Sequence, residues 1–191
     1  MLIAKIIIYA SIIVWFLPAF RQYKGKYFYY FLILALSDPL TFFSINVLQV
    51  SNYFFYSIAG ILLFYSIGTS TQSFLKYWKF NLLFIVVFLF TLFTLPNLLF
   101  LILILHILIL YKFIKQSVIR LHQSGELNYF LLVLIFYEIT ALLKVIAFIS
   151  GTDTGIIFFY LTLSFQILVA LFFTIFREDS SILTHKLRTL P

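Results

Sequence analysis

Apolar residues form long runs along the chain, separated by short polar breaks. A membrane-spanning helix needs roughly 20 mostly apolar residues, and fewer suffice where flanking Lys and Arg reach the interface. We therefore expect an all-α, polytopic membrane protein with seven transmembrane helices, forming a single transmembrane domain over residues 1–191. The expected spans are Leu2 to Phe20, Tyr27 to Val47, Tyr53 to Thr71, Phe74 to Thr94, Asn97 to Tyr111, Leu127 to Ile149 and Gly155 to Phe176.

The fourth and fifth runs meet at Pro96, in the stretch TLPN at residues 94–97. They could form a hairpin or one helix kinked at the proline. A single helix from Phe80 to Tyr111 would be about 48 Å long at 1.5 Å per residue, whereas the hydrocarbon core of a bilayer is about 30 Å thick. We therefore expect a hairpin.

The composition agrees with a membrane protein, because 64% of the residues are hydrophobic and only 10% are charged. A water-soluble domain carries far more charge. The net charge of +7 would suggest nucleic-acid binding in a soluble protein. Here the cations lie in short breaks between apolar runs, which is typical of a topology signal. We expect contact with the lipid bilayer and no nucleic-acid partner.

Basic residues concentrate on one side of the expected spans. Of the 13 Lys and Arg residues, all except Lys5 and Lys144 follow the first, third, fifth or seventh run. Lys and Arg in short loops favour the cytoplasmic side. We therefore expect the N-terminus outside and the C-terminus in the cytoplasm, in the cell membrane, which for a bacterium is the inner membrane.

The longest inner segment is KFIKQSVIRLHQSGE, from Lys112 to Glu126, in which apolar residues alternate with cations. Such a basic amphipathic stretch suits an anionic membrane surface or a partner protein. The simpler interpretation is that it extends the fifth helix beyond the bilayer.

Two pairs of similar stretches indicate an internal duplication. YFLILALSD at Tyr30 to Asp38 aligns with FLLVLIFYE at Phe130 to Glu138, acid on acid, and FFY occurs at Phe54 to Tyr56 and at Phe158 to Tyr160. Chance similarity between Phe- and Leu-rich helices is the alternative. One linker helix would keep the two halves parallel, so we expect a 3+1+3 repeat. The repeats would cover residues 1–73 and 97–176, with residues 74–94 as the linker helix.

This 3+1+3 plan resembles the SWEET and PQ-loop transporters in helix number and orientation, and more distantly the seven-helix receptor-like proteins. The chain contains no Pro-Gln pair, and its Asp38-Pro39 pair does not replace one. Architecture alone does not carry an activity, so we infer no sugar transport from the resemblance.

Two acids lie deep in the expected spans. Asp38 and Glu138 are each the twelfth residue of their run, which places both near the bilayer midplane. A charge at that depth costs roughly 2.5 to 3.5 kcal/mol, so each acid should be protonated or paired with a cation. Lys144 is the embedded cation besides Lys5, and we expect it to pair with Asp38 across a helix contact or to extend towards the outer surface.

Small polar residues accompany Asp38 on its helix. Ser37, Thr41 and Ser44 follow the i, i+4, i+7 spacing and form one polar stripe beside the acid. Such a stripe suits helix packing through small residues, or the wall of a polar cavity. Pro39 removes a backbone hydrogen bond and frees a carbonyl, which predicts a kink.

His106 on the fifth span and Gln166 on the seventh complete the set of deep polar residues. A lone histidine in a membrane helix is most often a packing residue, but helix neighbours could bring His106 near Asp38. The possible ligand or proton site predicted by the sequence therefore consists of Asp38, Glu138, Lys144, His106, Ser37, Thr41 and Gln166.

Familiar catalytic patterns do not occur in the sequence. It contains no Gly-x-Gly-Asp, no Gly-x-Ser-x-Gly and no HExxH, and we assign no catalytic, cofactor or metal residue. We favour a non-enzymatic sensing, scaffolding or assembly subunit that binds another membrane protein, or a second copy of itself, through its helices and basic inner loops. The alternative is a small transporter or channel with a proton- or cation-coupled site at Asp38 and Glu138, which would take an ion or small-molecule ligand.

Overall fold

The computed structural model describes residues 2–68, 75–151 and 155–186, and these residues are almost entirely helical. A π-helical turn, η1 (Ser44–Leu48), continues α2, and a 3-10 turn, η2 (Ser181–Leu183), precedes the second of two short strands. The all-α fold class is therefore confirmed. The remaining elements are α1 (Leu2–Arg21), α2 (Phe28–Phe43), α3 (Asn52–Ser66), α5 (Trp78–Thr94), α6 (Leu98–Ser124), β1 (Glu126–Asn128), α7 (Tyr129–Ile149), α8 (Gly155–Ile175) and β2 (Thr184–Lys186).

Several of these helices have the length and composition of membrane spans. Among the described residues, three helical stretches are long and apolar enough to cross a bilayer: Phe28–Leu48, Leu98–Ser124 and Tyr129–Ile149. Shorter apolar stretches occur in α1, α5 and α8. These helices indicate a membrane protein.

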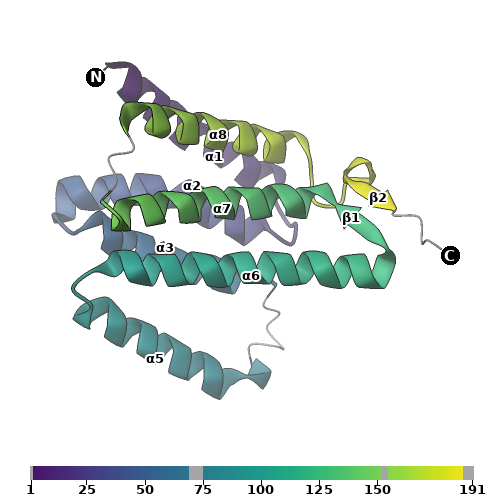
Figure 1. Cartoon of the computed structure of the whole chain (residues 1–191), viewed down its shortest axis with the longest axis horizontal. Helices are drawn as coiled ribbons and strands as arrows, with labels where there is room; N and C mark the ends of the chain where they lie inside the picture. The colour runs from purple at the N-terminus through teal and green to yellow at the C-terminus, as the bar shows by residue number, and fades with distance from the viewer. Residues whose placement is uncertain (1, 69–74, 152–154, 187–191) are drawn as a thin grey trace.

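Six helices form two layers of three (Figure 1). Helices α8, α7 and α6 lie side by side in front, and α1, α2 and α3 lie behind them. Each helix contacts the next one in the order α1, α2, α3, α6, α7 and α8, and α8 contacts α1. The six helices therefore form a closed ring. Helix α5 lies outside this ring, against α6 (Figure 1).

Aromatic side chains fill the space between the two layers. The ring of Phe173 lies 4.8 Å from those of both Phe31 and Phe130, measured between centroids. These three side chains come from α8, α2 and α7 and are almost completely buried. A second, smaller cluster holds α5, whose Phe88 and Leu92 pack with residues of α3 and α6.

Helices α5 and α6 are separate helices, and the non-helical residues 95–97 connect them. The predicted hairpin at Pro96 is thus confirmed (Figure 1). Asn97 is the N-cap of α6, and its side-chain oxygen accepts a hydrogen bond from the Leu99 amide at 3.0 Å. The helix then continues to Ser124 and ends at Gly125, whose φ of 64° is left-handed. The basic segment after Tyr111 therefore extends the fifth helix.

The chain after α8 folds back onto the bundle. Strand β2 pairs antiparallel with β1, with Glu126 opposite Lys186 and Asn128 opposite Thr184. This pairing keeps residues 126–128 extended, so α7 begins at Tyr129 and the predicted start at Leu127 is wrong. We call this end, which holds residues 22–27, β1 and the segment after α8, the C-terminal end of the bundle.

Other helix boundaries also differ from the expected spans. Helix α3 ends at Ser66, where the extended backbone of Ile67 and the left-handed Gly68 follow it. The predicted extension to Thr71 reaches residues outside the described part of the chain, as does the predicted start of α5 at Phe74. Helix α2 continues through Pro39 into η1.

Gly60 permits close packing of α3 on α6. A Cβ atom at Gly60 would lie 2.9 Å from Leu105 Cδ1. We predict that Gly60→Val destabilises the bundle by about 1 to 3 kcal/mol, because the larger side chain must displace Leu105. Reversible unfolding in mixed SDS and dodecylmaltoside micelles, followed by far-UV circular dichroism, measures the change. The control is Ala10→Val on the exposed side of α1, and equal effects of the two substitutions would contradict this packing.

Candidate functional site

Glu138 is the most deeply buried charged group among the described residues, with an exposure of 0%. The hydroxyl of Tyr30 on α2 donates a hydrogen bond to its Oε1. Nδ1 of His106 on α6 lies 2.8 Å from its Oε2, and the His106 side chain is 18% exposed. Each carboxylate oxygen therefore has a partner from a different helix, and Glu138 joins α7 to both α2 and α6.

These partners make the burial of Glu138 tolerable. An ionised carboxylate in an apolar interior is very costly unless it is paired and hydrogen-bonded. A phenol is a neutral donor, and the imidazole Nδ1 donates to the second oxygen when it carries a hydrogen. The arrangement can therefore hold three helices together.

Asp38 belongs to a second polar group. It is partly buried on α2, and the hydroxyl of Tyr56 on α3 lies 3.3 Å from its Oδ1. Lys144 on α7 lies within electrostatic range of the Asp38 carboxyl, although no ion pair of 4 Å or less joins them among the described residues. The structure thus brings Lys144 towards Asp38, while His106 contacts Glu138 instead.

Ser37 and Thr41 make hydrogen bonds within their own helix. Ser37 Oγ donates to the Leu34 carbonyl at 2.8 Å, and Thr41 Oγ1 donates to the Ser37 carbonyl at 2.7 Å. Thr41 is buried and Ser37 partly buried, so this side of α2 is turned towards the protein. Neither hydroxyl donates to Asp38. These bonds fit helix packing through small polar residues.

Asp38 and Glu138 lie at similar heights in the bundle. The rings of Tyr27 and Phe31 both contact that of Phe130, at 5.7 and 6.2 Å between centroids. Asp38 follows Phe31 by seven residues and Glu138 follows Phe130 by eight, which at 1.5 Å per residue is roughly 10 and 12 Å along the two helices. Gln166 is partly buried on α8, and no described hydrogen bond connects it to either acid.

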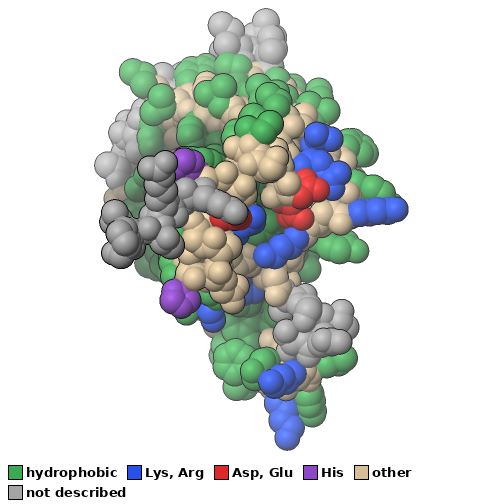
Figure 2. Space-filling view, turned by 90° about the vertical axis from the view of Figure 1, so that its right-hand side faces the viewer, with side chains coloured by type: hydrophobic (Ala, Val, Ile, Leu, Met, Phe, Trp, Pro, Cys, Tyr) green, Lys and Arg blue, Asp and Glu red, His purple; other side chains and the backbone are tan. Residues whose placement is uncertain are grey.

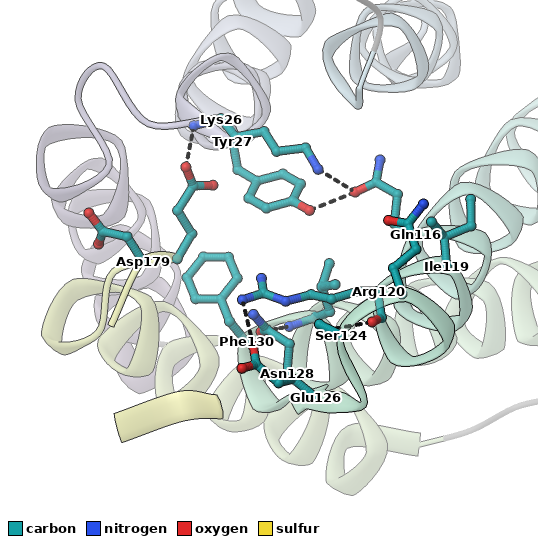
Figure 3. Close-up of a pocket in the computed structure, with 13 residues that line it drawn as sticks. Lys26, Tyr27, Gln116, Ile119, Arg120, Ser124, Glu126, Asn128, Phe130 and Asp179 are labelled. Carbon is teal, nitrogen blue, oxygen red and sulfur yellow. Dashed lines mark hydrogen bonds and ion pairs between the residues drawn. The ribbon is translucent and has the colours of Figure 1, made fainter. Parts of the chain in front are cut away.

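A pocket of about 590 Å³ lies at the C-terminal end of the bundle (Figure 3). Figure 2 shows this end, where basic and acidic side chains gather within a largely hydrophobic surface. Three of the lining residues carry a carboxylate and two carry a positive charge. The pocket is lined by Lys26, Tyr27, Gln116, Ile119, Arg120, Gln123, Ser124, Glu126, Asn128, Phe130, Leu131, Glu178 and Asp179.

Gln116 and Glu178 both bind the residues just before α2 at the edge of this pocket. The Lys26 ammonium and the Tyr27 hydroxyl both donate to Gln116 Oε1, at 3.2 and 2.6 Å. The Lys26 amide donates to Glu178 Oε1 at 2.5 Å. Partial burial lowers the pKa of the Lys26 ammonium, the Glu178 carboxylate opposes this change, and the Arg120 guanidinium adds to it. Figure 3 shows Tyr27 and Arg120 on opposite sides of the opening.

Aromatic rings connect the pocket with the buried acid. Tyr27 and Phe130 line the pocket, and the ring of Tyr27 also lies 6.1 Å from that of Phe113. Phe113 in turn lies 5.3 Å from the ring of Tyr30, whose hydroxyl contacts Glu138. Glu138 itself does not line the pocket.

Sequence reasoning missed the phenols that bind the two acids. Tyr30 and Tyr56 lie among other aromatic residues in α2 and α3, so the sequence carries no signal that separates them from their neighbours. Sequence reasoning also assigned Lys112 to the inner surface, whereas its ammonium donates to the carbonyls of Phe64 and Ile67 where α3 ends, at 2.5 and 3.3 Å. Gln22 does the same for α8, donating to Phe173 and Phe176.

The described residues contain no group of three or more His, Asp or Glu side chains that could hold a metal ion. The candidate site therefore consists of two parts: the polar groups around Glu138 and Asp38 between the helix layers, and the charged pocket at the C-terminal end.

Removing the Tyr30 hydroxyl tests the hydrogen bond to Glu138. We predict that Tyr30→Phe destabilises the protein by roughly 0.5 to 2 kcal/mol, because Glu138 Oε1 loses its donor in a site that water does not reach. The same micelle unfolding measurement reports the change. Tyr129→Phe, at an exposed position, is the matched control, and a Tyr30→Phe effect no larger than that of the control would show that the bond contributes little.

No protein-family model, curated protein or solved structure matches the chain. Its function is therefore inferred from the fold and from the geometry of these two groups of residues.

Proposed function

We propose that this chain is a non-enzymatic integral membrane protein with seven spans, its N-terminus outside and its C-terminus in the cytoplasm of the cell. The apolar stretches of α1, α2, α5, α6, α7 and α8 support six of these spans, and we propose α3 as the remaining one. The C-terminal end of the bundle, where charged side chains gather (Figure 2), would face the cytoplasm. Short connections at the opposite end leave little protein outside the bilayer.

Within this topology we propose that the protein acts as a sensing, scaffolding or assembly subunit. The observation that supports it best is the hydrogen bonding of Glu138, whose two oxygens are both bound inside the bundle by other helices. A deep acid with this environment serves as a helix contact, since it does not line the pocket. The deep polar residues then stabilise the bundle, and the outer surface is left for partners.

Two outer surfaces suit a partner in the membrane. Helix α5 packs mainly against α6 and leaves large side chains such as Phe90 and Phe93 exposed. The extension of α6 exposes Val118 and Ile119 beside Lys115, which combines apolar contact with positive charge. A second copy of this chain or another membrane protein could use either surface.

The order of helices in the ring supports the proposed duplication. A two-fold rotation about an axis parallel to the helices would place α1 on α6, α2 on α7 and α3 on α8, with α5 as the linker. The ring α1, α2, α3, α6, α7, α8 has the order that this rotation requires. It would also bring Asp38 to the position of Glu138.

Cysteine labelling tests the topology, because the natural chain has no cysteine. Ser51→Cys and His122→Cys are both exposed, and they lie at opposite ends of the bundle. We predict that a membrane-impermeant maleimide labels Ser51→Cys in intact cells and labels His122→Cys only after permeabilisation. Labelling of His122→Cys from outside would overturn the orientation.

Photocrosslinking tests the assembly role. With a photoreactive phenylalanine at Val118, we predict one discrete cross-linked species in cells, and a second, differently tagged copy of the chain shows whether the partner is the chain itself. Leu161 on α8 is a control that is also exposed, and equal, diffuse products from both positions would contradict a partner at α6.

A measurement of proton flux distinguishes an assembly subunit from a transporter. In liposomes with an internal pH dye and an imposed ion gradient, an assembly subunit gives no flux above that of empty liposomes. A coupled transporter would give flux that Asp38→Asn or Glu138→Gln abolishes, since each variant keeps the shape of the side chain and removes its titratable group. That result would replace the proposed assembly role by the transport alternative.

A further inference from the structure

The pocket at the C-terminal end has the size and construction of a small-ligand site. Its volume of about 590 Å³ falls within the roughly 300 to 1,000 Å³ typical of ligand pockets. Its walls come from the turn before α2, the last turns of α6, β1, the start of α7 and the segment after α8. Only the folded chain brings these segments together, and of the residues that line the pocket only Ile119 belongs to the partner surface proposed on α6.

Two cations, Lys26 and Arg120, line this pocket. Arg120 acts on Lys26 as a like charge, which lowers the pKa of the lysine. The Lys26 ammonium has three donors, one of which is bound to Gln116. The nearest acid to the Arg120 guanidinium is Glu126, at 3.9 Å, which is a long contact. An anionic group between the two cations would therefore gain charge-assisted hydrogen bonds from both.

Glu178, in contrast to the two cations, needs a hydrogen-bond donor from a ligand. Its Oε1 accepts the Lys26 amide, but its buried Oε2 has no hydrogen-bond partner among the described residues. A buried acceptor without a donor is costly. Because Glu178 also lines the pocket, a ligand that carries a donor, and best a positive charge, would satisfy it.

The spacing of these groups suits a ligand with both charges. Glu178 binds the backbone amide of Lys26, whose side chain reaches Gln116 on the other wall. The acidic and basic groups are thus separated by about one lysine side chain. Tyr27 and Phe130 stack at 5.7 Å beside them, and an aromatic surface attracts an ammonium group as well as apolar atoms.

We propose that this pocket binds a small zwitterion, with a phosphate held between Lys26 and Arg120 and an ammonium held by Glu178. This is the chemistry of phosphoethanolamine, which occurs both as a lipid headgroup and as a soluble molecule. In the topology proposed above, this pocket lies at the cytoplasmic end of the apolar helices, where both headgroups and cytoplasmic solutes would have access. The proposal does not depend on the assembly role.

Calorimetry on the full chain tests the proposal. The purified protein in lipid-depleted detergent micelles is titrated with O-phosphoethanolamine, with inorganic phosphate and with ethanolamine. We expect phosphoethanolamine to bind at least tenfold more tightly than either fragment, because each fragment satisfies only one wall of the pocket. Equal affinities for phosphoethanolamine and phosphate would overturn the proposal.

Three variants test which side chain binds the phosphate and which binds the ammonium. Arg120→Gln should weaken phosphoethanolamine and phosphate by a similar factor of at least ten. Glu178→Gln keeps an acceptor for the Lys26 amide, so it should weaken phosphoethanolamine and leave phosphate unchanged. Lys115→Gln, an exposed cation on α6 outside the pocket, should change neither. If Lys115→Gln matched Arg120→Gln, binding would reflect general surface charge and the pocket would not be the site.

Nanodiscs distinguish the two sources of the zwitterion. If the natural ligand is a lipid, nanodiscs of phosphatidylethanolamine should block the binding of soluble phosphoethanolamine, and nanodiscs of phosphatidylcholine should not. If it is a soluble molecule, binding should be equal in both. Loss of binding in both nanodiscs would show that the pocket closes in a bilayer, and this result would overturn the proposal.

Discussion

The hydrogen-bonded burial of Glu138 is the constraint on which the arrangement of the bundle depends. A carboxylate with no exposed surface must have its partners supplied by protein, and here they come from Tyr30 on α2 and His106 on α6. Tyr30 and Glu138 belong to opposite layers of the bundle (Figure 1). Sliding or rotation of α7 relative to α2 would therefore leave a buried acid unpaired, which is far more costly than the loss of an apolar contact. Phe and Leu contacts alone would tolerate many such displacements.

Polar side chains also satisfy the backbone where helices end. The amide of Gln22 binds carbonyls at the end of α8, and the ammonium of Lys112 binds carbonyls at the end of α3. Carbonyls in the last turn of a helix have no partner within the helix, and an apolar environment offers no water to replace one. Lys112, which resembles a surface charge in the sequence, thus acts as a helix cap. The same end of the bundle retains further charged groups that are not used as caps, and these form the pocket.

Much of the fold is local in origin and could be predicted. The apolar runs indicated where helices lie, Pro96 separated α5 from α6, and Gly125 ended α6. Other boundaries could not be predicted, because residues 126–128 remain extended through pairing with residues 184–186, far away in sequence. For the site, the sequence identified Asp38, Glu138, Lys144 and His106 as costly at depth. It did not identify Tyr30 or Tyr56, since a tyrosine in an aromatic-rich helix has no signal that separates it from its neighbours.

The sequence by itself determined which segments are helical, that they are apolar enough for a membrane, and which ionisable groups lie within them. These properties depend on the length and composition of single segments. Only the tertiary structure decided that His106 contacts Glu138 while Lys144 lies near Asp38, and that Lys26, Arg120 and Glu178 surround one pocket. Such pairings depend on which helices are neighbours and on how each is rotated about its axis. Helices that are apolar on almost every side carry little information about either, so the partner of each polar group is determined only when the helices pack.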